Sequence, residues 1–339
     1  MRLTILGKIQ NFKTLWLIGG SKQLHNQGLG GFLCSILKEG GSTRNFMWYQ
    51  RGSTGSYQQW ADAVGDQSYS FPNFLPYFKK SVQFSPPNQG ARAANATPLY
   101  DRSLFSSSGG PLKVSYPNFA SPAASWLALG LNAIGIKELP GGLEDGNLLG
   151  RTWIADTIDP VTQVRSTSES SILREALQLN DNLAVYGNTL AKKVVFDATK
   201  RATGVVAESV GLGSGSAIYT INATKEVIVS SGSFRSPQML MVSGIGPAAT
   251  LQNNGIEVLA DRPGVGQNVW DHIFFGPSYD VDTVTHSHLG DPAFTEQATQ
   301  EYIASRTGIL TNVGGDLLGK YKVNDAMFIS LKGSTLIFI

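Results

Sequence analysis

Apolar and polar residues alternate with a period of two through residues 183–232, which predicts a run of short β-strands. Turn residues separate the apolar segments LAVYG, AKKVVFDA, TGVVAESV, GSAIYTINA and EVIVSSG. The connections near 200–203 and in GLGSGS are short enough for hairpins. We therefore expect an antiparallel meander whose last strand is apolar enough to lie in a buried sheet.

Other stretches repeat their apolar residues at helical spacing. Helices are expected near residues 57–64, in FPNFLPYFKK, within 120–135, within 167–181 and near 294–305. The second of these begins with a proline and an asparagine cap, Asn73, and ends in lysines. The fourth opens with Ser/Thr and Glu at capping-box spacing.

The stretch GSFRSPQMLMVSGIGP, residues 232–247, directly follows EVIVSS, so a strand meets a glycine and then a helix. Ser236 is a suitable N-cap, and Pro237 suits the first helical position. A glycine permits close approach to the backbone, and a helix N-terminus attracts negative charge. The place therefore suits an anion or a flat cofactor, although on spacing alone an ordinary strand-to-helix connection is the simpler interpretation.

Composition narrows the classes of protein. The chain has 339 residues, of which 42% are hydrophobic and 15% charged, and this is typical of a globular protein. A net charge of +2 gives no reason to expect nucleic acid as a partner. The single cysteine, Cys34, excludes an intramolecular disulfide and a cysteine-based metal cluster. No stretch reaches the roughly 18 apolar residues of a membrane span, and polar residues interrupt the N-terminal apolar run, which makes a poor signal peptide.

Several familiar motifs are missing. TLWLIGG predicts a strand ending in glycines, but neither Gly19-Gly20 nor GLGGF places G-x-G-x-x-G between a strand and a helix. This disfavours a nicotinamide-dependent dehydrogenase. The chain also contains no G-x-S-x-G nucleophile elbow, no P-loop and no H-E-x-x-H, which disfavours a serine hydrolase, a P-loop nucleotide hydrolase and a zinc protease.

A second glycine-rich stretch, RPGVGQNVWDH, leaves two interpretations open. Gly264 and Gly266 could bring Gln267 and Asn268 to a ligand, or they could simply form a turn. His272 follows Asp271, but neighbours on a strand point to opposite faces, so this pair is weak evidence for a catalytic base.

Taken together, these stretches resemble one family. GSFRSPQMLMVSGIGP is similar to the second signature of the glucose–methanol–choline (GMC) FAD-dependent oxidoreductases and matches it at every specified position. GGSTRNFMWYQRG resembles the first signature region, and PGVGQNVWDH resembles a third segment, P-G-V-G-x-N-(L/M)-x-D-H. The landmarks cover residues 40 to about 280 in the family's order. NFMWYQRG and NVWDHIFFGPSY most resemble fungal members of the aryl-alcohol-oxidase-like and secondary-metabolism groups.

The resemblance implies an α/β fold: an incomplete Rossmann-like FAD-binding domain with a β-meander insertion, plus part of an antiparallel-sheet substrate domain. Residues 1–39 form an atypical N-terminal segment. Residues 40–280 correspond to the FAD-binding region without its first βαβ unit, with substrate-domain parts near 80–165. Residues 281–339 begin the substrate or C-terminal region.

The resemblance also implies a set of FAD-binding residues: Gly41, Ser42, Asn45, Ala191, Gly232, Ser236 and Asn268. The first three would lie near the flavin, and Ala191 falls where a backbone group meets the adenine in relatives. Gly232 would pass close to the ADP part, Ser236 would also meet the cofactor, and Asn268 would lie near the ring system.

Family members oxidise alcohols by moving a hydride to the flavin N5 while a histidine removes the hydroxyl proton. The resemblance therefore implies a small-molecule alcohol substrate, with oxygen and a quinone both open as electron acceptor. Members are often secreted, but this N-terminus leaves the compartment open.

The chain also departs from the family pattern. Relatives carry G-x-G-x-x-G upstream of the first signature and a catalytic histidine in a long C-terminal portion. We therefore expect a chain truncated at both ends, with the catalytic histidine beyond the C-terminus. The alternative is a catalytically inactive remnant or gene-model fragment of such an enzyme.

Overall fold

A computed structural model describes residues 2–7, 12–20, 40–209, 217–271, 276, 278–322 and 335–338; side chains are described in 41–209, 217–271, 276 and 278–322. The chain divides into two compact units. Unit 1 comprises Met1–Arg44 and Leu173–Pro277, and unit 2 comprises Asn45–Ile172 and Ser278–Ile339.

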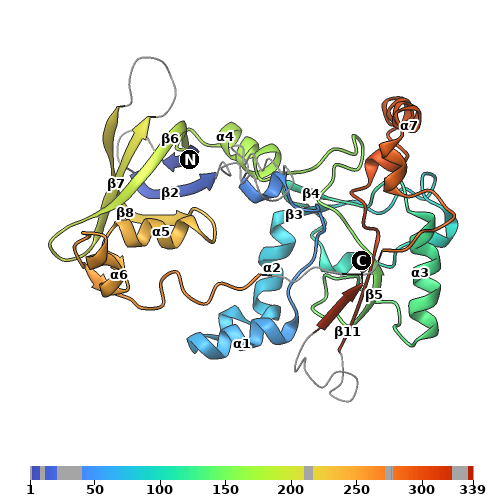
Figure 1. Ribbon diagram of the computed structural model, residues 1–339, viewed down its shortest axis with the longest axis horizontal. Coiled ribbons are helices and arrows are strands. Elements are labelled where there is room, and N and C mark those ends of the chain that lie inside the picture. Colours follow the sequence, from blue (N-terminus) through green and yellow to red (C-terminus); the bar gives the residue numbers. More distant parts are fainter. Residues whose placement is uncertain are drawn as a thin grey trace. The chain divides into compact units, whose positions relative to one another are not determined.

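Unit 1 is built on a closed barrel with the strand order β1-β2-β8-β7-β6 (Figure 1). The strands are β1 (Arg2–Gly7), β2 (Phe12–Gly20), β6 (Ala184–Phe196), β7 (Ala202–Ser209) and β8 (Ile218–Ser230). Pairing of β1 with both β2 and β6 closes the barrel, and β2 runs parallel to β8. The strand predicted at TLWLIGG is therefore confirmed as part of β2.

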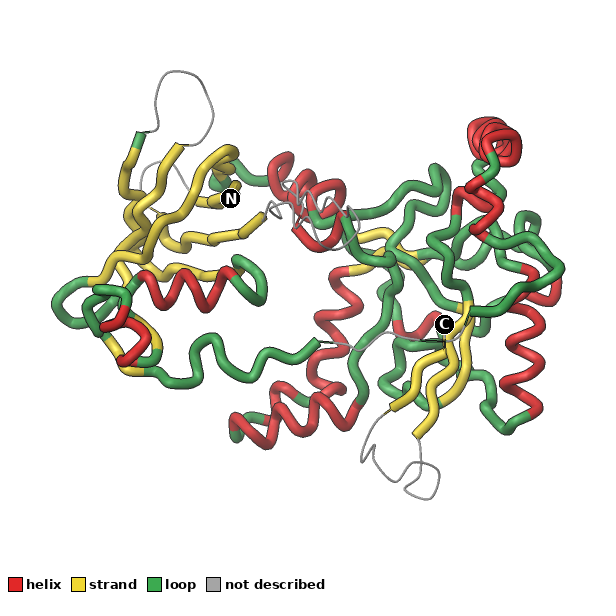
Figure 2. The backbone as a smooth tube through the Cα atoms, viewed as in Figure 1, coloured by secondary structure: helices red, strands yellow, loops and turns green. Residues whose placement is uncertain are grey.

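The predicted antiparallel meander is confirmed as β6-β7-β8, shown among the yellow strands of Figure 2. The expected number of strands was wrong, because LAVYG and AKKVVFDA form one strand, as do GSAIYTINA and EVIVSSG. Asn188 has a positive φ of 52°, and the pairing of β6 with β1 shifts register beside it. The pairing of β8 with β2 shifts between Ala223 and Glu226. At both places where a turn was expected, the strand continues and forms a β-bulge instead.

Short helices complete unit 1: α4 (Arg174–Leu179), α5 (Arg235–Val242) and α6 (Ala248–Asn253). Two-residue strands β9 (Ile245–Gly246) and β10 (Ala260–Asp261) pair in parallel. Helix α5 contacts β6 and β8 and contributes one residue to their buried core, which consists of Ala191, Val194, Val205, Ala207, Ile221, Ala223 and Met239.

The predicted cap of α5 was wrong. The helix begins at Arg235, so Ser236 and Pro237 lie inside its first turn rather than at its start. The Ser236 hydroxyl accepts a hydrogen bond from the Ser231 N–H at 2.9 Å, upstream of the helix. Proline is tolerated at this position because the N–H groups of a first turn have no partner within the helix.

Unit 2 contains the longer helices and two small sheets. Its helices are α1 (Thr54–Val64), α2 (Phe71–Ser81), α3 (Pro122–Ala133) and α7 (Pro292–Ser305). An antiparallel sheet has the order β12-β11-β5, and a parallel pair joins β3 to β4. These strands are β3 (Val82–Phe84), β4 (Leu112–Val114), β5 (Gly150–Trp153), β11 (Leu317–Lys322) and β12 (Thr335–Phe338).

Two predicted caps in this part of the sequence need correction. Ser70, not Asn73, occupies the N-cap position of α2. The Asn73 side chain instead donates to the Gln67 carbonyl at 2.8 Å and the Ser70 hydroxyl at 3.1 Å. The stretch 167–181 forms a π-helical turn at Glu169–Leu173 that continues into α4.

The capping box of that stretch is formed by Thr167 and Ser170, whose backbone N–H groups each donate to the other's hydroxyl, at 2.8 and 3.0 Å. A serine therefore does what the predicted glutamate was expected to do. No helix in the described part of the chain has the length and apolar character that crossing a bilayer requires.

Candidate functional site

The end of β8 forms a tight connection to α5. Strand β8 stops at Ser230, and Gly232 turns the chain with a φ of +88°. The Ser236 N–H donates to the Gly232 carbonyl at 2.9 Å, while the Ser236 hydroxyl holds the Ser231 N–H at 2.9 Å. These two bonds lock the turn onto the first turn of the helix.

This connection combines an open backbone position with an unpaired polar group. A Cβ added to Gly232 would meet no heavy atom within 4 Å, so the backbone there faces free space. Ser231 is only 5% exposed, and its hydroxyl has no hydrogen-bond partner among the described residues. A buried hydroxyl without a partner lowers the free energy of unfolding by about 1–3 kcal/mol. An approachable backbone beside an unsatisfied donor fits a bound ligand.

The glycine-rich loop at residues 262–268 lies against the same helix. It is folded by hydrogen bonds from Val265 N–H to the Arg262 carbonyl (3.1 Å) and from Gln267 N–H to the Gly264 carbonyl (3.2 Å). A Cβ at Gly266 would lie 3.5 Å from Met241 and 3.7 Å from Pro237, both on α5.

Asn268 is the last residue of this loop; it is exposed and adopts the left-handed conformation, with φ +52°. His272 lies outside the described residues, so its weak prediction as a base stays a prediction.

Ala191 lies on β6 in the core that α5 completes, and it is 4% exposed. Its side chain is therefore occupied by packing, and only its backbone is available to a ligand. The pairing of β6 with β7 shifts between Ala191 and Lys193, a β-bulge that interrupts the ladder beside this residue.

The first signature region is divided between the units. Gly41 and Ser42 lie in unit 1 on a 3-10 turn, Gly40–Thr43, where a Cβ at Gly41 would meet nothing within 4 Å. Asn45 belongs to unit 2, where its Oδ1 accepts from the Met47 N–H at 2.9 Å and from Arg165 at 2.7 Å. Unit 1 thus contains every predicted cofactor residue except Asn45.

Unit 2 buries several charged side chains. Arg51 is 3% exposed and donates to the carbonyls of Leu104 (2.9 Å) and Glu144 (3.1 Å). Burial raises the pKa of the Glu144 carboxyl to about 8, against the opposing attraction of Arg51. Both carboxylate oxygens of Asp156, a residue 1% exposed, lack a partner among the described residues. Burial and then the neighbouring Asp316 raise the pKa of Asp156 well above its ordinary value.

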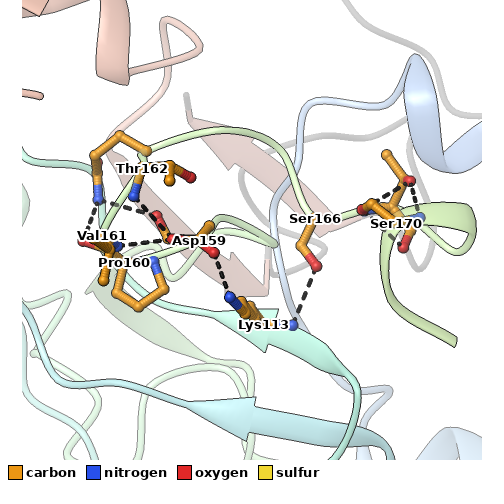
Figure 3. A network of polar contacts seen from close by, with 9 residues as sticks. Lys113, Asp159, Pro160, Val161, Thr162, Ser166 and Ser170 are labelled. Atoms are coloured by element: carbon orange, nitrogen blue, oxygen red, sulfur yellow. Dashed lines mark hydrogen bonds and ion pairs between the residues drawn. The ribbon is translucent and has the colours of Figure 1, made fainter. Parts of the chain in front are cut away.

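A surface network in unit 2 holds a turn to β4 (Figure 3). Lys113 pairs with Asp159, whose other carboxylate oxygen accepts from the N–H groups of Val161 and Thr162, both at 2.9 Å. Burial acts to raise the pKa of Asp159, but these donors outweigh it and hold the pKa at about 2. The Ser166 hydroxyl accepts from the Lys113 N–H at 3.2 Å. All of these groups bind one another, so the network is structural.

The described residues contain no group of three or more His, Cys, Asp or Glu side chains placed to hold an ion. The strand–glycine–helix connection of unit 1 is therefore the candidate site. Sequence reasoning selected Gly232 and Ser236 but missed Ser231, for which the only signal was a serine directly before the glycine.

Comparison with models of known protein families matches residues 32–274 to the GMC oxidoreductases. The chain belongs to this family. It is 46% identical over 284 residues to patulin synthase of Aspergillus clavatus, covering 84% of this chain and 44% of that protein. It is 47% identical over 298 residues to versicolorin B synthase of Aspergillus parasiticus, covering 87% of this chain and 45% of that protein. The chain thus spans about half the length of these GMC relatives.

Two solved structures of FAD-dependent or aryl-alcohol-oxidising enzymes have a similar fold. An FAD-dependent oxidoreductase from Chaetomium thermophilum superposes with a TM-score of 0.74 at 30% identity, covering 86% of this chain and 49% of that one. A fungal aryl-alcohol oxidase gives a TM-score of 0.74 at 25% identity, covering 84% of this chain and 48% of that one. The predicted family, the predicted similarity to fungal members and the mixed helix-and-sheet fold are confirmed, and FAD is the family's cofactor.

The residues at the end of β8 fit this cofactor. Open space at Gly232 would admit a nucleotide, and the unpaired Ser231 hydroxyl would find a partner on it. The dipole of α5 adds partial positive charge at this end of the helix, which favours phosphate oxygens.

Proposed function

We propose that the protein to which this chain belongs oxidises the CH–OH group of a small alcohol in fungal secondary metabolism. Its GMC relatives include patulin synthase and versicolorin B synthase, and a fungal aryl-alcohol oxidase shares the fold. Bound FAD would supply the redox chemistry by accepting a hydride at N5. Oxygen and a quinone are the two acceptors to be tested for reoxidation.

The turn at Gly232 is the observation that supports the proposal most directly. In our proposal, Gly232 lets the ADP part of FAD approach the backbone, and Ser236 keeps that turn in place. Ala191 contributes a backbone group from β6, and Asn268 and the first-signature residues Gly41, Ser42 and Asn45 lie toward the flavin. These residues bind and orient; none of them is proposed to move the substrate proton.

A substitution at Gly232 tests the site. Gly232→Val would place a branched side chain in the open space, so FAD binding should weaken at least about tenfold. Gly255→Val is the matched control, because Gly255 also has a positive φ (+67°) and open space around its Cβ. Both variants should lose about 1–3 kcal/mol of stability from backbone strain, but only the first should lose FAD. Titration of flavin fluorescence measures the affinity.

The reaction is tested on the whole protein to which this chain belongs, loaded with FAD. An alcohol from an aryl and aliphatic panel, added without oxygen, should bleach the flavin absorbance, and oxygen or a quinone should restore it. If FAD binds but no alcohol bleaches it, alcohol oxidation by this protein is refuted. If Gly232→Val and Gly255→Val bind FAD equally well, the site at the end of β8 is wrong.

A further inference from the structure

Ser231 has an unusual environment for a serine. It is 5% exposed, its hydroxyl finds no partner in the described part of the chain, and its N–H is already used by Ser236. Among the described residues it is the sole hydroxyl that is both buried and unpaired. By contrast, the hydroxyl of Ser243 at the end of α5 donates to the Met239 carbonyl at 2.6 Å and accepts from the Val194 N–H at 2.8 Å.

A buried hydroxyl without a partner opposes folding, because it has lost its bonds to water and gained none. An alanine would fill nearly the same volume without this cost. The hydroxyl therefore contributes nothing to the fold that the structure describes. It becomes favourable only when another molecule supplies an acceptor.

The position of Ser231 indicates what that molecule is. Ser231 comes directly before Gly232, where the backbone faces open space, and its N–H is tied to the first turn of α5. That turn belongs to an eight-residue helix whose dipole favours negative charge at its N-terminal end. The acceptor therefore belongs to the charged half of a dinucleotide rather than to its neutral ring system.

We propose that the Ser231 hydroxyl donates a hydrogen bond to an oxygen of the adenosine-diphosphate half of FAD. The inference rests on the FAD site of the proposed function and adds a side-chain donor to what was a backbone contact. Ser231 is then a cofactor-binding residue. Its unpaired hydroxyl destabilises the chain without FAD, and the hydrogen bond to FAD offsets this destabilisation.

The test compares Ser231→Ala with Ser243→Ala in the full chain. Ser231→Ala should weaken FAD and ADP binding about tenfold or more, because a hydrogen bond to a charged acceptor is lost. Without FAD, its melting temperature should equal or exceed that of the unsubstituted chain. Ser243→Ala should show the reverse pattern, with a lower melting temperature and unchanged FAD affinity, because its hydroxyl is paired within the fold.

Each contrary result has a definite meaning. If Ser231→Ala binds FAD as tightly as the unsubstituted chain, or melts at a lower temperature without FAD, the inference is wrong while FAD binding itself stands. If the variant weakens riboflavin binding but not ADP binding, the assignment to the diphosphate half is wrong. If the unsubstituted chain binds no FAD, the proposed site fails first, and the inference fails with it.

Discussion

Glu144 should make the stability of this protein fall as the pH rises. Its carboxyl is 3% exposed, and burial raises its pKa to about 8, against the opposing attraction of Arg51. In the folded chain the group therefore stays protonated at pH values where the unfolded chain has already released the proton. Replacing it with glutamine, which has nearly the same shape and no proton to lose, should remove this dependence.

The sign and size follow from proton linkage. Between pH 4.5 and about 8 the folded state binds up to one more proton than the unfolded state, so the free energy of unfolding decreases as the pH rises. The stabilising contribution is complete below pH 4.5 and is lost as the pH passes through about 8. The interval between these values corresponds to roughly 3–5 kcal/mol in total, at up to about 1.4 kcal/mol for each pH unit.

Urea unfolding at pH 5, 6, 7 and 8, followed by tryptophan fluorescence, measures this slope. Glu144→Gln should match the unsubstituted chain near pH 5 and exceed it by a few kcal/mol at pH 8. Glu296→Gln is the control, because it makes the same chemical substitution at an exposed glutamate on α7. Other buried carboxyls titrate alike in all three proteins, so the difference isolates Glu144.

Parallel stability curves for Glu144→Gln and the unsubstituted chain would show that Glu144 is ionised in the folded state. The argument from burial would then be wrong. A slope that changes equally in Glu296→Gln would instead point to a general effect of net charge.

Substitutions that affect three other carboxyls of unit 2, those of Asp159, Asp156 and Asp316, should change stability in different directions. Lys113→Met should raise the pKa of Asp159 from about 2. A lowered carboxyl pKa stabilises the folded state at higher pH, so the variant should lose up to about 1 kcal/mol of unfolding free energy at pH 6. Urea unfolding should show that this difference disappears below pH 2. Asp156→Asn should raise the melting temperature at pH 8, because burial raises the pKa of Asp156 and both its oxygens lack a partner among the described residues. Asp316→Asn should lower it, because both oxygens of Asp316 accept hydrogen bonds, from the Ser121 N–H at 2.6 Å and from the Asn312 side-chain amide, and asparagine keeps one acceptor oxygen. Calorimetry that finds the two asparagine variants equally stable would contradict this distinction.

The alternating pattern of 183–232 was sufficient to predict the meander, because side-chain alternation is a local property of a strand. Strand ends were less predictable. The stretches around Asn188 and Ala223–Glu226 contain polar residues typical of turns, yet neighbouring strands of the barrel absorb them as bulges. Pairing with a distant strand decides between a turn and a bulge, and no local pattern records that pairing.

The candidate site was predictable only as far as its backbone. A strand followed by a glycine and a helix marks Gly232 in the sequence, and its positive φ confirms the reason for a glycine there. The helix start shifted because Ser236 bonds backward to Ser231 instead of forward along the helix. Burial of Glu144 could not be predicted, because it lies in a polar, glycine-rich stretch that is typical of exposed loops. Asp156 follows the apolar residues WIA, but a carboxyl is rarely buried, so its residue type gave no sign of burial.

The buried polar groups of this protein differ in what can reduce the free-energy cost of burying them. Glu144 and Asp156 are carboxyls, so each can bind a proton and become neutral, and burial raises the pKa of both groups accordingly. Their burial therefore needs no ligand. The Ser231 hydroxyl cannot change its charge near neutral pH, and only a hydrogen-bond acceptor relieves it. Of the unpaired buried oxygen atoms in the described residues, the Ser231 hydroxyl is thus the one whose chemistry, together with the open backbone at Gly232, calls for a bound molecule.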